Sequence, residues 1–218
     1  MFSVKRAAAA FAAGCALSFS AQAKPIAFGK GTTVMAEYGA GTMNEVQAFY
    51  APHYWYSLGG AWLSLSAQNG EKSRHISALR ANMLAKRWNY PTAQANVFAW
   101  GGIGLATGND FSGSQLSRNI GVQADYETRW VYASARSDLV ETKVFSHRID
   151  TVQLGFAPYP HEYGGLATWL VLQGRSYTGG IYDGVEAALL LRLFKGGTWV
   201  EAGVSGDGKL QAMAMFNF

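Results

Sequence analysis

The last ten residues of the chain, Lys209 to Phe218, alternate between two kinds of position. One set is apolar throughout: Leu210, Ala212, Ala214, Phe216 and Phe218. The other set is mixed: Gln211, Met213, Met215 and Asn217. This period of two predicts a β-strand with one apolar face. A tilted strand of about ten residues is long enough to cross a bilayer.

Similar segments, separated by Gly, Asn, Asp and Ser, recur along the rest of the chain. They predict twelve strands, at residues 30–39, 44–52, 58–67, 74–86, 93–105, 116–127, 130–139, 147–157, 165–176, 185–195, 198–205 and 209–218. An even number of strands puts both termini on one side, and a closed barrel leaves no unpaired strand edge in lipid. The sequence therefore predicts an all-β fold: a transmembrane, up-and-down, antiparallel β-barrel of about 12 strands, formed as a single domain by residues 24–218.

The turns predict which residues face each other. Gly196-Gly197 is a two-residue turn that pairs Arg192 with Glu201 inside the barrel, together with Phe194 and Trp199. The same register pairs three sets of apolar residues on the outside: Leu193 with Val200, Leu191 with Ala202, and Leu189 with Val204. The three residues from Gly206 to Gly208 predict a three-residue loop before the last strand.

The hairpin between segments 116–127 and 130–139 is a second test of register. A two-residue turn at Thr128-Arg129 predicts that Asp125 faces Tyr132 and that Gly121 faces Arg136. A slip of one residue would put Arg136 into lipid, at a cost of about 2–4 kcal/mol near the midplane.

Composition favours a membrane barrel over the alternatives. The chain has 218 residues, of which 49% are hydrophobic and only 15% are charged. The mature chain has no run of 18 apolar residues, which argues against membrane-spanning helices. A soluble lipocalin-like barrel would need a polar outer face, whereas the outer faces predicted here carry residues such as Leu189, Ile120 and Val122.

The N-terminus predicts a cleaved secretory signal peptide over residues 1–23. Lys5 and Arg6 precede an apolar stretch, and Ala21-Gln22-Ala23 is a small-x-small cleavage site. Cys15, the one cysteine, would leave with this segment, so neither a disulfide nor a cysteine metal site is expected. The residues before Cys15 faintly resemble a lipoprotein signal without its usual leucine, and lipidation of Cys15 is the alternative.

Charge and motifs argue against nucleic acid and against a cofactor. The full chain has 18 basic and 14 acidic residues. Removal of Lys5 and Arg6 would leave 16 basic residues against 14 acidic ones, a net charge of about +2. The run Gly101-Gly102-Ile103-Gly104 lacks a following helix, so it predicts a curved strand and not a phosphate loop.

The final strand also resembles a known class of protein. Lys209–Phe218 resembles the closing strand of bacterial outer-membrane β-barrels, whose C-terminal aromatic residue is part of the signal read by the insertion machinery. The resemblance implies that the protein lies in the bacterial cell outer membrane, with outer-membrane lipids and the barrel-insertion machinery as partners. It covers the chain as architecture, and no motif matches a functionally defined family.

With both termini in the periplasm, the predicted periplasmic turns are rich in aromatic residues. Such residues form an interfacial girdle at headgroup depth. The set is Tyr54, Trp55, Tyr56, Trp88, Tyr90, Tyr126, Trp130, Tyr159, Tyr163, Phe194, Trp199 and Phe218. The opposite loops contain short polar runs at residues 68–72, 107–110, 141–143 and 178–180, which leave no room for a plug domain.

Charged residues predicted to line the lumen are the first candidate site. Twelve strands leave a narrow interior, between packed eight-stranded barrels and open sixteen-stranded porins. The charges form either a satisfied network that fills this interior or a constriction that selects small solutes. The predicted inward-facing set is Glu37, Arg80, Asp125, Arg136, Arg175, Glu186, Arg192 and Glu201.

Two further groups are candidates for chemistry. His75-Ile76-Ser77 is similar to the outward-facing His-x-Ser pair of some outer-membrane lipid hydrolases, in which the imidazole takes the hydroxyl proton. The flanking residues do not match those families, and a chance match at the interface is the alternative. Met35, Met213 and Met215 are predicted to point inward, where thioethers either bind soft copper or simply fill space.

These observations predict a non-enzymatic outer-membrane barrel that forms a narrow, porin-like channel for small solutes or ions. Two alternatives stay open: a structural barrel with a sealed lumen, and a lipid hydrolase that uses His75 and Ser77. The sequence does not indicate which solute would pass.

Overall fold

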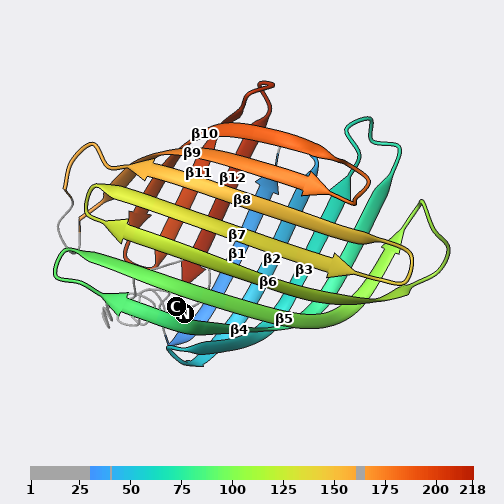
Figure 1. The fold of residues 1–218 in the computed structure, drawn as a ribbon, viewed down its shortest axis with the longest axis horizontal. Helices are drawn as coiled ribbons and strands as arrows, with labels where there is room; N and C mark the ends of the chain where they lie inside the picture. The colour runs from blue at the N-terminus through green and yellow to red at the C-terminus, as the bar shows by residue number, and fades with distance from the viewer. Residues whose placement is uncertain (1–29, 40, 161–164) are drawn as a thin grey trace, which may run out of the picture.

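The computed structural model of the chain describes residues 30–39, 41–160 and 165–218. In these ranges it forms twelve strands: β1 (Gly31–Gly39), β2 (Met43–His53), β3 (Tyr56–Ser66), β4 (Ser73–Asn89), β5 (Ala93–Gly108), β6 (Gln115–Thr128), β7 (Val131–Glu141), β8 (Ser146–Phe156), β9 (Ala167–Thr178), β10 (Gly184–Lys195), β11 (Thr198–Ser205) and β12 (Leu210–Asn217). Each strand pairs antiparallel with its sequence neighbours, and β1 pairs with β12 to close the barrel (Figure 1). The predicted all-β fold and closed twelve-stranded barrel are confirmed. The predicted signal peptide, with Cys15, lies outside the described residues.

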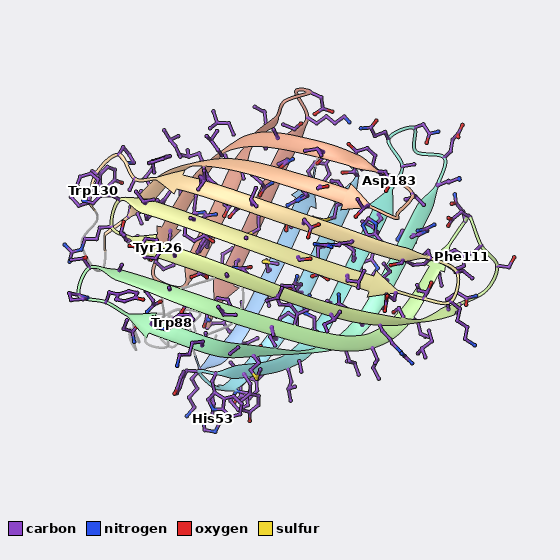
Figure 2. The ribbon with its side chains drawn as sticks, viewed as in Figure 1. His53, Trp88, Phe111, Tyr126, Trp130 and Asp183 are labelled. Atoms are coloured by element: carbon purple, nitrogen blue, oxygen red, sulfur yellow. The ribbon has the colours of Figure 1, made fainter. Side chains whose placement is uncertain are left out.

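The start of β1 and the end of β12 lie together at one end of the barrel. Thr33 is the partner of Asn217, and the Thr32 N–H donates to the Phe218 carbonyl oxygen at 2.6 Å. We call this the terminal end, and the opposite end the distal end. Figure 2 places Trp88, Tyr126 and Trp130 at one end and Phe111 and Asp183 at the other. Within the described ranges, no helix is long and apolar enough to cross a membrane.

Alternation along the strands separates an apolar outer surface from a polar interior. Leu79, Ile103 and Ile120 point outward and are 73%, 65% and 62% exposed. Arg192 and Gln211 point inward and are 2% and 4% exposed. This is the reverse of a soluble barrel, in which apolar residues fill the inside.

The β10–β11 hairpin has the register that its glycines predict. Arg192 faces Glu201, Phe194 faces Trp199, and the three outer apolar pairs are all formed. The β11–β12 loop closes with hydrogen bonds between Ser205 and Lys209, so its predicted three residues are also confirmed.

The predicted register of the β6–β7 hairpin is wrong by two residues. Arg136 faces Gln123 and not Gly121, and Asp125 faces Ser134 and not Tyr132. The cause is Thr128, whose hydroxyl accepts hydrogen bonds from the Trp130 and Val131 N–H groups at 3.0 and 2.8 Å. Thr128 is therefore the last residue of β6, and the turn lies one residue later than predicted. Because the shift is an even number, each side chain still faces the predicted side.

Strand β4 is longer than predicted because a β-bulge interrupts its alternation. Its pairing with β5 shifts between Leu84 and Lys86, so Ala85 is an extra residue. Beyond the bulge the parity of the inward positions changes, and the strand continues to Asn89. A prediction that requires strict alternation therefore ends the strand near the bulge.

Aromatic residues at the terminal end divide between the surface and the interior. Tyr54, Trp88 and Trp130 are 63%, 40% and 52% exposed. Trp199 is instead only 5% exposed and packs inside with Phe194, so these two do not belong to the predicted girdle. Tyr163 lies outside the described residues.

Candidate functional site

The structure turns all eight predicted charged residues toward the interior. Each stands on a strand along which inward and outward positions alternate. Two further charged residues, Glu45 on β2 and Arg74 on β4, follow the same alternation and are buried, as is Asp138 on β7, which the alternation of 130–139 predicts to face inward. Alternation along each strand is the sequence signal that identifies these inward-facing residues. A role in solute passage stays a prediction for the predicted set: Glu37, Arg80, Asp125, Arg136, Arg175, Glu186, Arg192 and Glu201.

The largest ionic cluster joins three separate parts of the wall. Arg136 on β7 lies 3.5 Å from Glu45 on β2 and 2.9 Å from Asp138. Arg80 on β4 lies 3.7 Å from the other Glu45 oxygen and donates to Gln47 Oε1 at 2.5 Å. Two guanidinium groups thus share two carboxylates, and the cluster has no excess charge.

Aromatic rings hold this cluster in place. The guanidinium carbons of Arg80 and Arg136 lie 5.5 and 5.2 Å from the Trp100 ring centroid. The Trp100 indole N–H donates to Asp138 Oδ2 at 3.0 Å, and Asn119 donates to Asp138 Oδ1 at 2.5 Å. Both guanidinium groups of the cluster therefore have an ionic partner and an aromatic partner.

A second ion pair crosses the interior between strands that are not neighbours. Arg175 on β9 pairs with Glu37 on β1, and it also donates to the Tyr177 hydroxyl at 3.5 Å. Gly39 makes room for this crossing, since a side chain there would come within 2.9 Å of Arg175 Nη1.

The third ion pair joins the neighbouring strands β10 and β11. Arg192 Nε donates to Glu201 Oε1 at 2.7 Å, and the Trp199 indole N–H donates to the same oxygen at 2.7 Å. The Arg192 guanidinium also lies 4.4 Å from the ring centroids of Tyr132 and Trp199.

The last two predicted residues lie apart from these pairs. Glu186 accepts hydrogen bonds from Thr42 and Tyr177 at 3.2 and 3.3 Å near the distal end. Asp125 accepts from Asn96 at 2.6 Å toward the terminal end.

Two cavities of about 40 and 70 Å³ lie among these residues. Glu37, Arg136, Thr151 and Arg175 line both, so the cavities meet at the crossing ion pair. A cavity needs about 10–15 Å³ to hold a water molecule. Buried nitrogen atoms of Arg80, Arg175 and Gln211 have no protein hydrogen-bond partner among the described residues. Water is therefore the natural partner for these donors.

The distal end is closed by apolar side chains. Met43, Leu65, Ile76, Val140 and Tyr177 form a buried cluster with Phe145, and Phe111, Ile181 and Tyr182 pack against it from the connecting loops. The sequence predicted short polar loops here. Three of these loops, those with polar runs at 107–110, 141–143 and 178–180, also contain apolar residues beyond the run, and these pack into the cluster.

One arginine ties two of these loops to the wall. Arg74 on β4 pairs with Asp110 in the β5–β6 loop at 2.6 Å. Its guanidinium also lies 4.1 Å from the ring centroid of Phe145, which precedes β8. The hydrogen bonds from Arg74 hold the pKa of the Asp110 carboxyl below its ordinary value. The Asp110 carboxyl is therefore ionised at neutral pH.

The two remaining candidate groups lie on opposite sides of the wall. His75 and Ser77 point outward, as predicted, and the His75 ring stacks on Trp62 with centroids 6.0 Å apart. Within the described residues no hydrogen bond joins His75 to Ser77, and hydrolysis by this pair stays a prediction.

The three methionines pack inside at the seam of the barrel. Met35 faces Met215 across β1 and β12, and both are buried against Trp199 with Met213 beside them. The described part of the chain contains no group of three or more His, Cys, Asp or Glu residues that could hold a metal. Copper binding by Met35, Met213 and Met215 stays a prediction, and the contacts fit space filling.

Comparison with known proteins finds solved structures that are similar in structure and share little sequence identity. No family model matches the chain, and no curated protein matches it. The chain is similar in structure to the KdgM porin, with a TM-score of 0.49 and 12% identity over 86% of this chain and 98% of that one. A structure of the KdgM porin in complex with disordered oligogalacturonate gives a TM-score of 0.49 and 10% identity over the same shares.

Proposed function

We propose that this protein is an outer-membrane barrel that provides a narrow path for small solutes or ions. The observation that carries the proposal is the pair of cavities that meet at Arg136, Arg175 and Glu37 inside the closed barrel. Buried nitrogens of Arg80, Arg175 and Gln211 beside them have no protein hydrogen-bond partner among the described residues, as expected of donors that bind water. A hydrated polar interior enclosed by an apolar wall is the arrangement of a membrane channel.

The outer surface supports a place in a membrane. Leu79, Ile103 and Val185 are 73%, 65% and 76% exposed, which would be unfavourable in water over so large a surface. The predicted signal peptide and the C-terminal aromatic Phe218 favour the bacterial outer membrane. They also favour the barrel-insertion machinery and outer-membrane lipids as partners.

A sealed structural barrel is the second candidate, and the distal end favours it. The apolar cluster around Phe145 and the Arg74–Asp110 ion pair both close that mouth. A channel of this design must therefore open by movement of the distal loops, whereas a sealed barrel would never open.

Single-channel recording in planar bilayers separates the two. We expect discrete conductance steps from the refolded protein. Their size or ion preference should change in Arg192→Ala and Glu201→Ala, since each leaves one uncompensated charge in the lumen. Silence from all three proteins, each with a heat-shifted band on gels that shows folding, would favour the sealed barrel.

A further inference from the structure

Three glutamines continue the hydrogen bonding of Arg192 around the inner wall. Arg192 Nη2 donates to Gln153 Oε1 at 2.7 Å, and Gln153 Nε2 donates to Gln173 Oε1 at 2.8 Å. Gln173 Nε2 then donates to Gln211 Oε1 at 2.8 Å. All donors point the same way along this row, and a charged group stands at its start. Such a chain polarises its members and strengthens the final donor.

The row ends at a donor that has no acceptor. Gln211 is 4% exposed, and its Nε2 is buried with no hydrogen-bond partner among the described residues. Gln211 lines the larger cavity of about 70 Å³, together with Gln153 and Gln173. We call this cavity the amide chamber. A buried N–H without an acceptor is unfavourable, so the chamber is suited to a molecule that offers Gln211 an oxygen.

The charges around the amide chamber balance and are already paired. Two arginines and two glutamates line it: Arg136, Arg175, Glu37 and Glu201. Arg175 pairs with Glu37, Glu201 with Arg192, and Arg136 with Glu45 and Asp138. An ion entering the chamber would lose hydration without gaining a free counter-charge. An uncharged polar molecule would instead find amide donors and acceptors to replace its water.

We propose that the amide chamber admits small uncharged solutes bearing a carbonyl or hydroxyl oxygen in preference to ions, and that Gln211 recognises this oxygen. The inference rests on the proposed path through the barrel and names the class of solute that uses it. The small volume of the chamber limits the solute to a few non-hydrogen atoms, as in urea or glycerol.

Flux measurements in proteoliposomes test the proposal. Entry of urea and glycerol is followed by stopped-flow light scattering, and entry of sodium and chloride by ion-sensitive dyes. In the wild-type protein, urea should enter faster than either ion. Gln211→Leu removes the donor at similar side-chain size and should lower urea flux roughly three- to tenfold, the worth of one hydrogen bond, with ion flux unchanged. Gln115→Leu, which lies outside the chamber, is the matched control and should leave both fluxes unchanged.

A second variant keeps the test informative if Gln211→Leu folds poorly. Gln211→Glu removes the donor and adds an unpaired negative charge, so it should lower urea flux and raise sodium flux. Unchanged urea flux in both folded variants would overturn the proposal. Ion flux that exceeds urea flux in the wild-type protein would overturn it too, while leaving the channel function intact. No flux of any solute above that of protein-free vesicles would overturn the channel function itself, and this inference with it.

Discussion

Removing one partner of the Arg192–Glu201 ion pair should destabilise the barrel more than the pair itself stabilises it. Both side chains are almost completely buried, at 2% and 5% exposure, and their atoms lie 2.7 Å apart. Loss of one partner from such a pair costs about 3–5 kcal/mol, because a charge is left buried without compensation. Replacement of both partners by apolar residues is often close to neutral.

The surviving contacts set the order of the two single variants. In Glu201→Leu, Arg192 keeps its hydrogen bond to Gln153 and the rings of Tyr132 and Trp199, so we expect a cost near the lower limit, about 3 kcal/mol. In Arg192→Leu, Glu201 keeps the hydrogen bond from the Trp199 indole N–H, so we expect a cost near the upper limit, about 5 kcal/mol. The double variant should cost at least about 2 kcal/mol less than the sum of the two.

Urea unfolding in lipid vesicles, followed by tryptophan fluorescence, measures these free energies. The same cycle on Asp207 and Lys209, an exposed pair at 2.9 Å in the distal loop between β11 and β12, is the control and should show no measurable coupling. Additivity of the Arg192 and Glu201 effects within about 0.5 kcal/mol would refute the description of this pair as buried and mutually compensating.

Two further predictions concern the distal mouth and the packing of the wall. The pKa of the Asp110 carboxyl is lowered in the folded state, so its ion pair with Arg74 stabilises the closed mouth at neutral pH and is lost as the pH falls through that lowered pKa. Acid on the distal side should therefore raise the open probability of the channel. The Asp110→Asn variant should be more open at neutral pH, and its open probability should not respond to acid. An acid response as large in the variant as in the wild type would contradict this. The Trp100 ring lies directly over Gly121, so Gly121→Ala should lower the free energy of unfolding by about 1–3 kcal/mol in the same urea assay. Gly101 lies on the open outer face, so Gly101→Ala is the control and should be neutral or slightly stabilising. Equal effects of the two substitutions on the free energy of unfolding would show that the position of the Trp100 ring does not require glycine at residue 121.

The register of a hairpin could be predicted where glycine residues form the turn. It could not be predicted where a side-chain hydrogen bond determines the position of the turn. Gly196-Gly197 allows one tight turn, and every predicted pair of β10 and β11 is formed. At β6–β7 the turn depends on the Thr128 hydroxyl, which two backbone N–H groups share, and the register was wrong by two. Alternation constrains only the parity of a register, so the inward faces were correct in both hairpins.

The direction of each charged side chain could be predicted, but most of its partners could not. Arg192 and Glu201 are cross-strand neighbours, so the turn between them predicts their contact. Arg175 and Glu37 are separated by three intervening strands, and their meeting depends on how the closed barrel is staggered. The glutamine row was not predicted, because glutamine is neutral and because Gln173 on β9 and Gln211 on β12 meet across two intervening strands only in the closed barrel.

The most direct test of a path through the interior is chemical block of the current from a single introduced cysteine. Thr151 lines both cavities, and its neighbour Val152 points outward with 57% exposure. The one native cysteine, Cys15, lies in the predicted signal peptide. A charged, water-soluble thiol reagent should therefore reduce the current through Thr151→Cys and leave the current through Val152→Cys unchanged. Equal block of both variants, or no block of either, would contradict passage through this interior.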